Sequence, residues 1–154
     1  MASRRHFLIA AGGLAGGMRL VSASGNAHAT PDEMREAVRK VIGSSRVQSG
    51  RVKLDLPPLI DNGNSVSLSV AVESPMTPAD HVKAIHVFTE KNPLPNVVSV
   101  YLGPRAGRAN IATRVRIADT QTVTAIAEMS DGSFWSGSMS VVVTLSACLE
   151  DGLI

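Results

Sequence analysis

The sequence predicts an all-β fold, an immunoglobulin-like antiparallel β-sandwich of about seven strands with one N-terminal helix. Hydrophobic residues make up 44% of the chain and aromatic residues only 3%, so a core must be built from Val, Ile, Leu and Ala. Such a composition favours sheet over a helix bundle. From residue 51 onward, short β-type segments alternate with turn signals, and 154 residues fit a single domain of this kind.

Residues 1–29 have the pattern of an export signal. A twin arginine, Arg4-Arg5, precedes an apolar run rich in Gly and Ala over 9–17, and Ala27-His28-Ala29 provides a small-x-small cleavage pattern. The run is too short for a membrane-spanning helix, so no membrane insertion is expected. The segment therefore predicts a twin-arginine (Tat) signal peptide over 1–29, export to the periplasm, and a mature chain that begins near Thr30.

The formal charge of +2 depends on that leader. Arg4, Arg5 and Arg19 lie within it, and taking those three from the 15 basic residues leaves 12 against 13 acidic ones. The expected mature charge is about −1 by this count, which gives no electrostatic case for nucleic acid or for an anionic membrane surface.

Residues 30–50 are predicted to form an N-terminal helix and a linker. Thr30 suits the N-cap, Pro31 the first helical position and Glu33 the third residue of a capping box. Gly43 ends the pattern. Apolar residues recur at helical spacing and form a stripe that we expect to dock on the domain: Met34, Ala37, Val38, Val41 and Ile42.

Residues 51–146 are predicted to form the sandwich. A turn at 61–64 precedes an alternating strand over 66–72. Residues 81–90 and 97–102 are apolar on both faces, as expected of central strands or of strands covered by a partner. Two further predictions follow along the chain: a hairpin between 111–117 and 121–129 around 118–120, and a turn at 130–133 into the last strand.

The last strand leads to the only cysteine of the chain, Cys148, in the predicted C-terminal tail 147–154. Period-two alternation puts Val141 and Val143 on one face and Val142 and Thr144 on the other, more polar face. Continued to Cys148, it places the thiol on the polar face. In an oxidising compartment a lone cysteine pairs with another molecule, reacts, or is buried.

Signals of catalysis are weak elsewhere. His81 and His86 are the only histidines after the leader, and a separation of five residues puts them on opposite faces of a strand, which argues against a shared metal site. Arg114 and Arg116 share one strand face, which is either simply solvated or suited to an anionic partner or substrate. We find no phosphate loop or dinucleotide fingerprint in the sequence, and therefore expect no cofactor and a protein that is not an enzyme.

Several short segments form a characteristic set along the chain: 61–64 (DNGN), 72–76 (VESPM), 81–86 (HVKAIH), 91–93 (KNP), 102–107 (LGPRAG), 112–116 (ATRVR) and 129–135 (MSDGSFW). Together and in this order they resemble one family, SoxY, the sulfur-carrier subunit of the bacterial thiosulfate-oxidising Sox system. The resemblance covers essentially the whole chain, including the twin-arginine leader.

This resemblance implies an immunoglobulin-like fold and an obligate heterodimer with a SoxZ-like subunit. It also implies a covalent role, in which a cysteine on a flexible C-terminal arm holds sulfur intermediates. Haem and manganese enzymes, the Sox-type cytochrome and hydrolase, would then act on that cargo. Cys148 is the position that matches the attachment cysteine.

The tail departs from the family pattern. The family's arm ends Gly-Gly-Cys-Gly-Gly, whereas Cys148 stands here in SACLEDGLI. Glycines give such an arm conformational freedom, and Ala147 and Leu149 add bulk instead. Glu150 and Asp151 are expected to raise the thiol pKa.

Two hypotheses follow. The first is a periplasmic sulfur-compound carrier with Cys148 as the attachment point. The second is a SoxY-like structural or interaction module that has lost the carrier role, with Cys148 packed or idle. A third class, a redox enzyme that uses Cys148 directly, lacks a resolving cysteine, acid or base nearby in the sequence.

Overall fold

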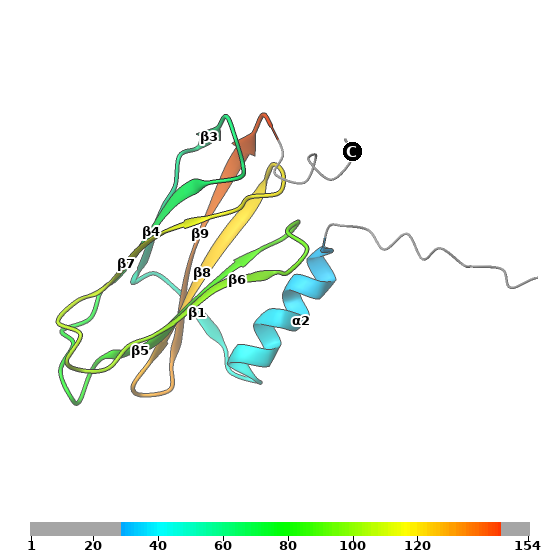
Figure 1. Ribbon diagram of the computed structural model, residues 1–154. Coiled ribbons are helices and arrows are strands. Elements are labelled where there is room, and N and C mark those ends of the chain that lie inside the picture. Colours follow the sequence, from blue (N-terminus) through cyan, green and yellow to red (C-terminus); the bar gives the residue numbers. More distant parts are fainter. Residues whose placement is uncertain (1–28, 146–154) are drawn as a thin grey trace, which may run out of the picture.

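The computed structural model describes residues 29–145, which form two packed β-sheets with one helix lying against the larger sheet (Figure 1). The helix is α2 (Pro31–Ile42). The strands are β1 (Val47–Ser49), β2 (Val52–Asp55), β3 (Leu59–Ile60), β4 (Val66–Val72), β5 (Val82–Thr89), β6 (Asn96–Tyr101), β7 (Ala109–Val115), β8 (Gln121–Met129) and β9 (Phe134–Val143). No helix within 29–145 is long and apolar enough to cross a membrane.

The larger sheet has the order β1-β9-β8-β5-β6, with β3 added beside the end of β9, and the smaller sheet has the order β2-β4-β7. This confirms the predicted all-β, immunoglobulin-like sandwich with an N-terminal helix. The described residues contain nine strands rather than about seven. The two additional strands, β1 and β3, are only three and two residues long, and both pair in parallel with β9.

The core lies between the sheets and is aliphatic, as the composition predicts. In β4, alternate residues are buried and the residues between them face outward, which confirms the predicted period-two pattern. Close packing extends to the corner where β2 crosses β9. A Cβ added at Gly137 would lie 2.3 Å from the backbone oxygen of Val52, so this position of β9 requires glycine.

Helix α2 begins and ends where the sequence predicts. Glu33 N donates to Thr30 Oγ1 at 3.3 Å and Thr30 N donates to Glu33 Oε2 at 2.6 Å, which forms the capping box, and Gly43 N donates to the carbonyl of Arg39. The apolar stripe packs against Phe88, Ile126 and Phe134 on the outer face of the larger sheet. The predicted docking of this helix on the domain is therefore confirmed.

The predicted hairpin between 111–117 and 121–129 is wrong. Strand β7 pairs with β4 in the smaller sheet, whereas β8 lies between β5 and β9 in the larger one. Residues 116–120 therefore cross from one sheet to the other. The crossing is fixed by Asn92, whose Oδ1 accepts from Ala118 N at 2.9 Å and whose Nδ2 donates to Arg116 O at 2.7 Å.

The two segments predicted to be apolar on both faces differ from each other. Strand β5 is central and buried on both faces, with only Lys83 exposed. Strand β6 is an edge strand, and Asn96, Ser99 and Tyr101 are exposed. Of the two explanations offered for β6, a central position is excluded. Cover by a partner stays a prediction.

Strand β9 follows the predicted alternation only as far as Val143. Val141 and Val143 are buried, and Ser140 and Val142 are exposed. Regular pairing ends at Val143, and Thr144 and Leu145 form a bend. The strand therefore ends five residues before Cys148, so its alternation cannot be used to place the thiol.

Candidate functional site: the base of the C-terminal tail

The last described residues, Val143–Leu145, are called the tail root here, because they lead into residues 146–154, called the tail. Backbone hydrogen bonds hold the root against β3 and the loop 61–64. Thr144 N donates to Ile60 O at 2.9 Å, and Gly63 N donates to Leu145 O at 3.0 Å. The hydroxyl of Thr144 also donates to Asp61 O at 3.1 Å. The fold thus fixes the point from which the tail departs.

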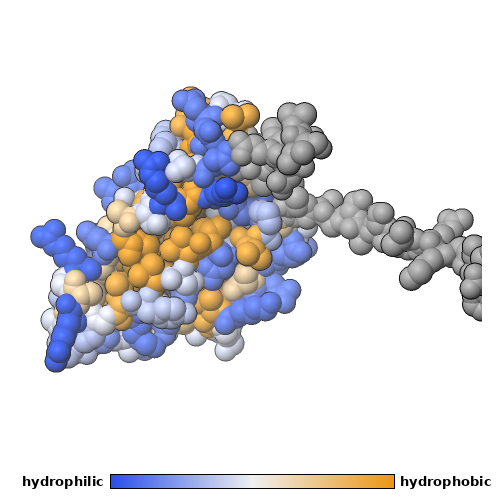
Figure 2. Space-filling model, in the orientation of Figure 1, coloured by the Kyte–Doolittle hydropathy of each residue, from blue (hydrophilic) through white to orange (hydrophobic). Residues whose placement is uncertain are grey.

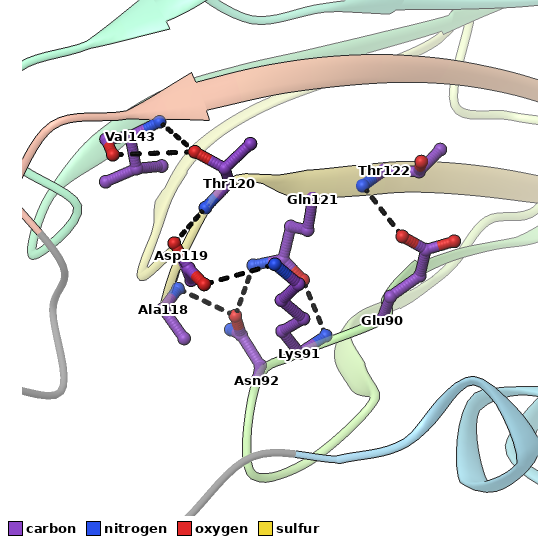
Figure 3. A network of polar contacts seen from close by, with 9 residues as sticks. All are labelled: Glu90, Lys91, Asn92, Ala118, Asp119, Thr120, Gln121, Thr122 and Val143. Carbon is purple, nitrogen blue, oxygen red and sulfur yellow. Dashed lines mark hydrogen bonds and ion pairs between the residues drawn. The ribbon is translucent and has the colours of Figure 1, made fainter.

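The other side of the root is held by the crossing between the sheets (Figure 3). Val143 N donates to Thr120 Oγ1 at 3.0 Å, and Thr120 N donates to Asp119 Oδ1 at 2.6 Å. Behind them, Gln121 Nε2 donates to Asn92 Oδ1 at 3.0 Å, and this amide pair is buried. Buried, fully paired amides of this kind fix one local geometry.

Cys148 itself lies outside the described residues, as do all of the tail, which includes the predicted segment 147–154, and the signal segment up to residue 28. The prediction that Cys148 is the attachment point therefore stays a prediction. The described residues limit only how far Cys148 can lie from the end of the sandwich. Cys148 follows Leu145 by three positions, so the two Cα atoms can lie at most about 11 Å apart.

A groove of about 420 Å³ lies between the edge strands β6 and β7. Its lining includes apolar side chains from the β5–β6 loop and from both strands: Leu94, Val97, Val98 and Val115. Arg114 and Arg116 border it. Figure 2 shows the corresponding apolar surface, exposed over the space between β7 and β6, with strongly hydrophilic residues beside it.

The two histidines do not form a site together. His81 Nδ1 lies 3.1 Å from Thr77 O in the β4–β5 loop. His86 is buried on the outer face of β5, with Nδ1 2.8 Å from Ser99 Oγ and its ring edge-on to Tyr101. Burial lowers the pKa of His86, and the charge of Glu128 opposes that shift. Within 29–145, no three His, Cys, Asp or Glu residues are grouped to hold a metal ion.

The residues that build the root were not identified from the sequence as functional. Thr120 was predicted only as part of a hairpin turn and Gly63 as part of the turn 61–64, and Asn92 belongs to a segment noted for its resemblance to a family. The structure brings those two segments, 61–64 and 91–93, to the same end of the sandwich, where both support the tail root. The loop 61–64 also contains a buried acceptor, Asn64 Oδ1, without a donor among the described residues.

Several solved structures have a fold similar to that of this chain. A structure of the sulfur carrier protein SoxY from Chlorobium limicola f thiosulfatophilum is similar to this chain, with a TM-score of 0.63 and 24% sequence identity over 74% of this chain and 98% of that chain. A superoxide reductase (neelaredoxin) from Ignicoccus hospitalis has a TM-score of 0.54 and 15% identity, with coverage of 79% and 98%. A superoxide reductase from Nanoarchaeum equitans has a TM-score of 0.51 and 8% identity, with coverage of 62% and 100%.

At these identities the structural likenesses show the fold alone, and the superoxide reductases carry no argument about activity. No curated protein matches the chain. Family membership rests on a sequence model instead. The model described as "Sulfur oxidation protein SoxY" matches residues 38–148, which include the C-terminal part of α2, the whole sandwich and Cys148. The chain therefore belongs to the SoxY family of sulfur oxidation proteins.

Proposed function

We propose that this protein is a non-catalytic carrier that holds sulfur intermediates covalently on Cys148. One observation carries the proposal: the only cysteine of the chain lies three residues beyond a root that the fold fixes from both sides, at the end of the family match. A carrier needs a rigid body, a defined point of departure and a reachable thiol. Catalytic groups are not required on the body itself.

The carrying step is a thiol exchange. The thiolate of Cys148 attacks a sulfur–sulfur bond of a donor such as tetrathionate, a new Sγ–S bond forms, and thiosulfate leaves with the bonding electron pair. The product is a thiosulfonate on Cys148, and no further oxidant is needed. Loading from thiosulfate itself is a two-electron oxidation that releases the thiol proton, and its electrons must go to a partner such as a haem protein.

The compartment and the partners belong to the same proposal. The leader 1–29 supports export by the Tat pathway to the periplasm, where an unpaired thiol has no internal partner. A SoxZ-like subunit would form the heterodimer, and Sox-type cytochrome and hydrolase enzymes would load and unload the thiol. The exposed edge strand β6, with Tyr101 76% exposed, supports the presence of a partner surface.

The test is intact-mass measurement on the purified protein after exposure to tetrathionate. We expect the mass of one S₂O₃ group to be added and then removed by a reductant. Cys148→Ser is the matched control and should gain no mass. An unmodified wild-type protein whose thiol also resists iodoacetamide would overturn the proposal in favour of a module that has lost carrying.

A further inference from the structure

The groove between β6 and β7 combines two features that point to one kind of occupant. Its floor is apolar, and Leu94 at its border is 75% exposed. Its β7 side is cationic, because Arg114 and Arg116 are exposed and neither forms an ion pair within residues 29–145. Arg114 Nη1 donates to Ser65 Oγ at 3.1 Å, which leaves its other N–H groups available. An extended segment with both acidic and apolar side chains would match such a groove.

The tail root is connected to one end of this groove through Gly63. Gly63 N donates to Leu145 O at 3.0 Å, and Gly63 O accepts from Ile117 N at 2.8 Å. One glycine and two hydrogen bonds therefore connect the last described residue to the neighbour of Arg116. Residue 150 follows Leu145 by five positions, and five extended residues span up to about 17 Å. A segment of that length is sufficient to follow the two hydrogen-bonded steps from Leu145 to Ile117, which is next to Arg116, and Arg114 lies two residues further back in the chain.

The tail has the matching chemistry. Residues 146–154 read SACLEDGLI, with Glu150 and Asp151 as adjacent acids and no basic residue. Leu149 and Leu153 lie on either side of the acids and could pack on the valines of the groove.

We infer that the tail of this same chain docks in the groove between β6 and β7, with Glu150 and Asp151 paired to Arg114 and Arg116. Docking holds Cys148 against the body of the protein and slows its reactions, and release of the tail presents the thiol. The inference rests on the proposed function for its biological meaning, because it describes when the carrier thiol is available. The docking itself requires no cargo.

The experiment measures the alkylation rate of Cys148 by iodoacetamide in the purified protein at low salt. We expect Arg114→Glu combined with Arg116→Glu to raise the rate roughly threefold to tenfold, the scale of losing two exposed ion pairs. Charge cannot produce this increase by acting on the thiol, because removing positive charge raises the thiol pKa and slows alkylation. High salt should raise the wild-type rate and leave the variant's rate unchanged.

Two matched variants make the test specific. Arg105→Glu with Arg108→Glu makes the same charge change in the exposed β6–β7 loop, at the opposite ends of both strands, and should leave the rate unchanged. Adding Glu150→Arg and Asp151→Arg to the Arg114→Glu, Arg116→Glu variant should restore slow alkylation. This reversal distinguishes docking from damage to the fold.

Three results would overturn the inference: equal rates in wild type and the Arg114→Glu, Arg116→Glu variant, an equal increase in the loop variant, or slow alkylation that appears only at high protein concentration. The last would assign the groove to a second copy of the chain. Adduct formation with tetrathionate is scored separately by mass. A freely exposed thiol that still carries S₂O₃ refutes docking alone, and a docked thiol that never carries it refutes the proposed function alone.

Discussion

The sandwich has two apolar surfaces outside its central core, and the described part of the chain covers only one of them. The first, on the outer face of the larger sheet, contains Phe88, Ile126 and Phe134, and helix α2 covers it. The second is the groove between β6 and β7, which no described residue covers and which two arginines border. Both are of a size that a short segment of chain can fill.

The two surfaces also differ in the burial and the charge of their side chains. The stripe of the helix is half-buried, and it packs against aromatic side chains that are themselves almost completely inaccessible, so this contact is part of the fold. The groove has exposed side chains at its rim, and charged groups there favour an acidic segment. A surface that is covered permanently needs volume and shape, whereas one that is covered reversibly benefits from charge, which salt and substitution can modulate.

The sharpest contrast between the surfaces comes from truncating one side chain in each. Phe88 is fully buried under α2, so Phe88→Ala should lower the free energy of unfolding by about 3–5 kcal/mol. Leu94→Ala, at the exposed rim of the groove, should cost about 0.5 kcal/mol or less. Urea unfolding of both variants measures this. A cost for Leu94→Ala near that for Phe88→Ala would show that the groove is packed as permanently as the helix surface.

The corner between β2 and β9 tests whether permanent contacts elsewhere are equally close. Gly137→Ala would place a methyl group 2.3 Å from Val52 O, and the two strands must separate to accept it. We expect a loss of about 1–3 kcal/mol in the free energy of unfolding. Gly103→Ala is the control, because no atom lies within 4 Å of its added Cβ. Equal stability of the two variants would contradict the close packing of this corner.

The attachment of α2 can be weakened without touching its apolar stripe. Thr30→Ala removes the side-chain half of the capping box and should cost about 1 kcal/mol. Because α2 is one part of a cooperative domain, the loss should appear in the global unfolding transition rather than in a separate early step. Thr30→Ser, which keeps the hydroxyl, should restore most of the stability. An early loss of helical signal would show that α2 docks on the sandwich independently.

Local patterns predicted those parts of the fold that depend on neighbours in the sequence. The cap of α2 and the alternation of β4 require only residues within one element. The crossing at 116–120 was predicted as a hairpin because its turn signals are the same in both arrangements. What decides between them is Asn92, 26 residues from Ala118, and no local pattern contains that contact.

The candidate site was only partly predictable for the same reason. Cys148 stands out by composition alone. The tail root, however, is assembled from β3, the loop 61–64 and Thr120, which are far from Val143 in the chain. Arg114 and Arg116 were recognised as a charged face, but a groove beside them exists only because the β5–β6 loop lies next to the end of β7.

His86 provides the mildest test of the surface beside the helix, since it lies on the same outer face as Phe88 but next to the exposed strand β6. Burial lowers the pKa of His86 below its ordinary value of 6.5, while Glu128 opposes this. The unfolded chain therefore binds a proton at a higher pH than the folded one, and stability is fully present above pH 6.5 and falls as the pH drops through that value. His86→Gln should remove this dependence, as measured by urea unfolding between pH 7.5 and 5. An unchanged pH profile in the variant would show that this face is open to water at His86, and that close cover ends at the residues beneath α2.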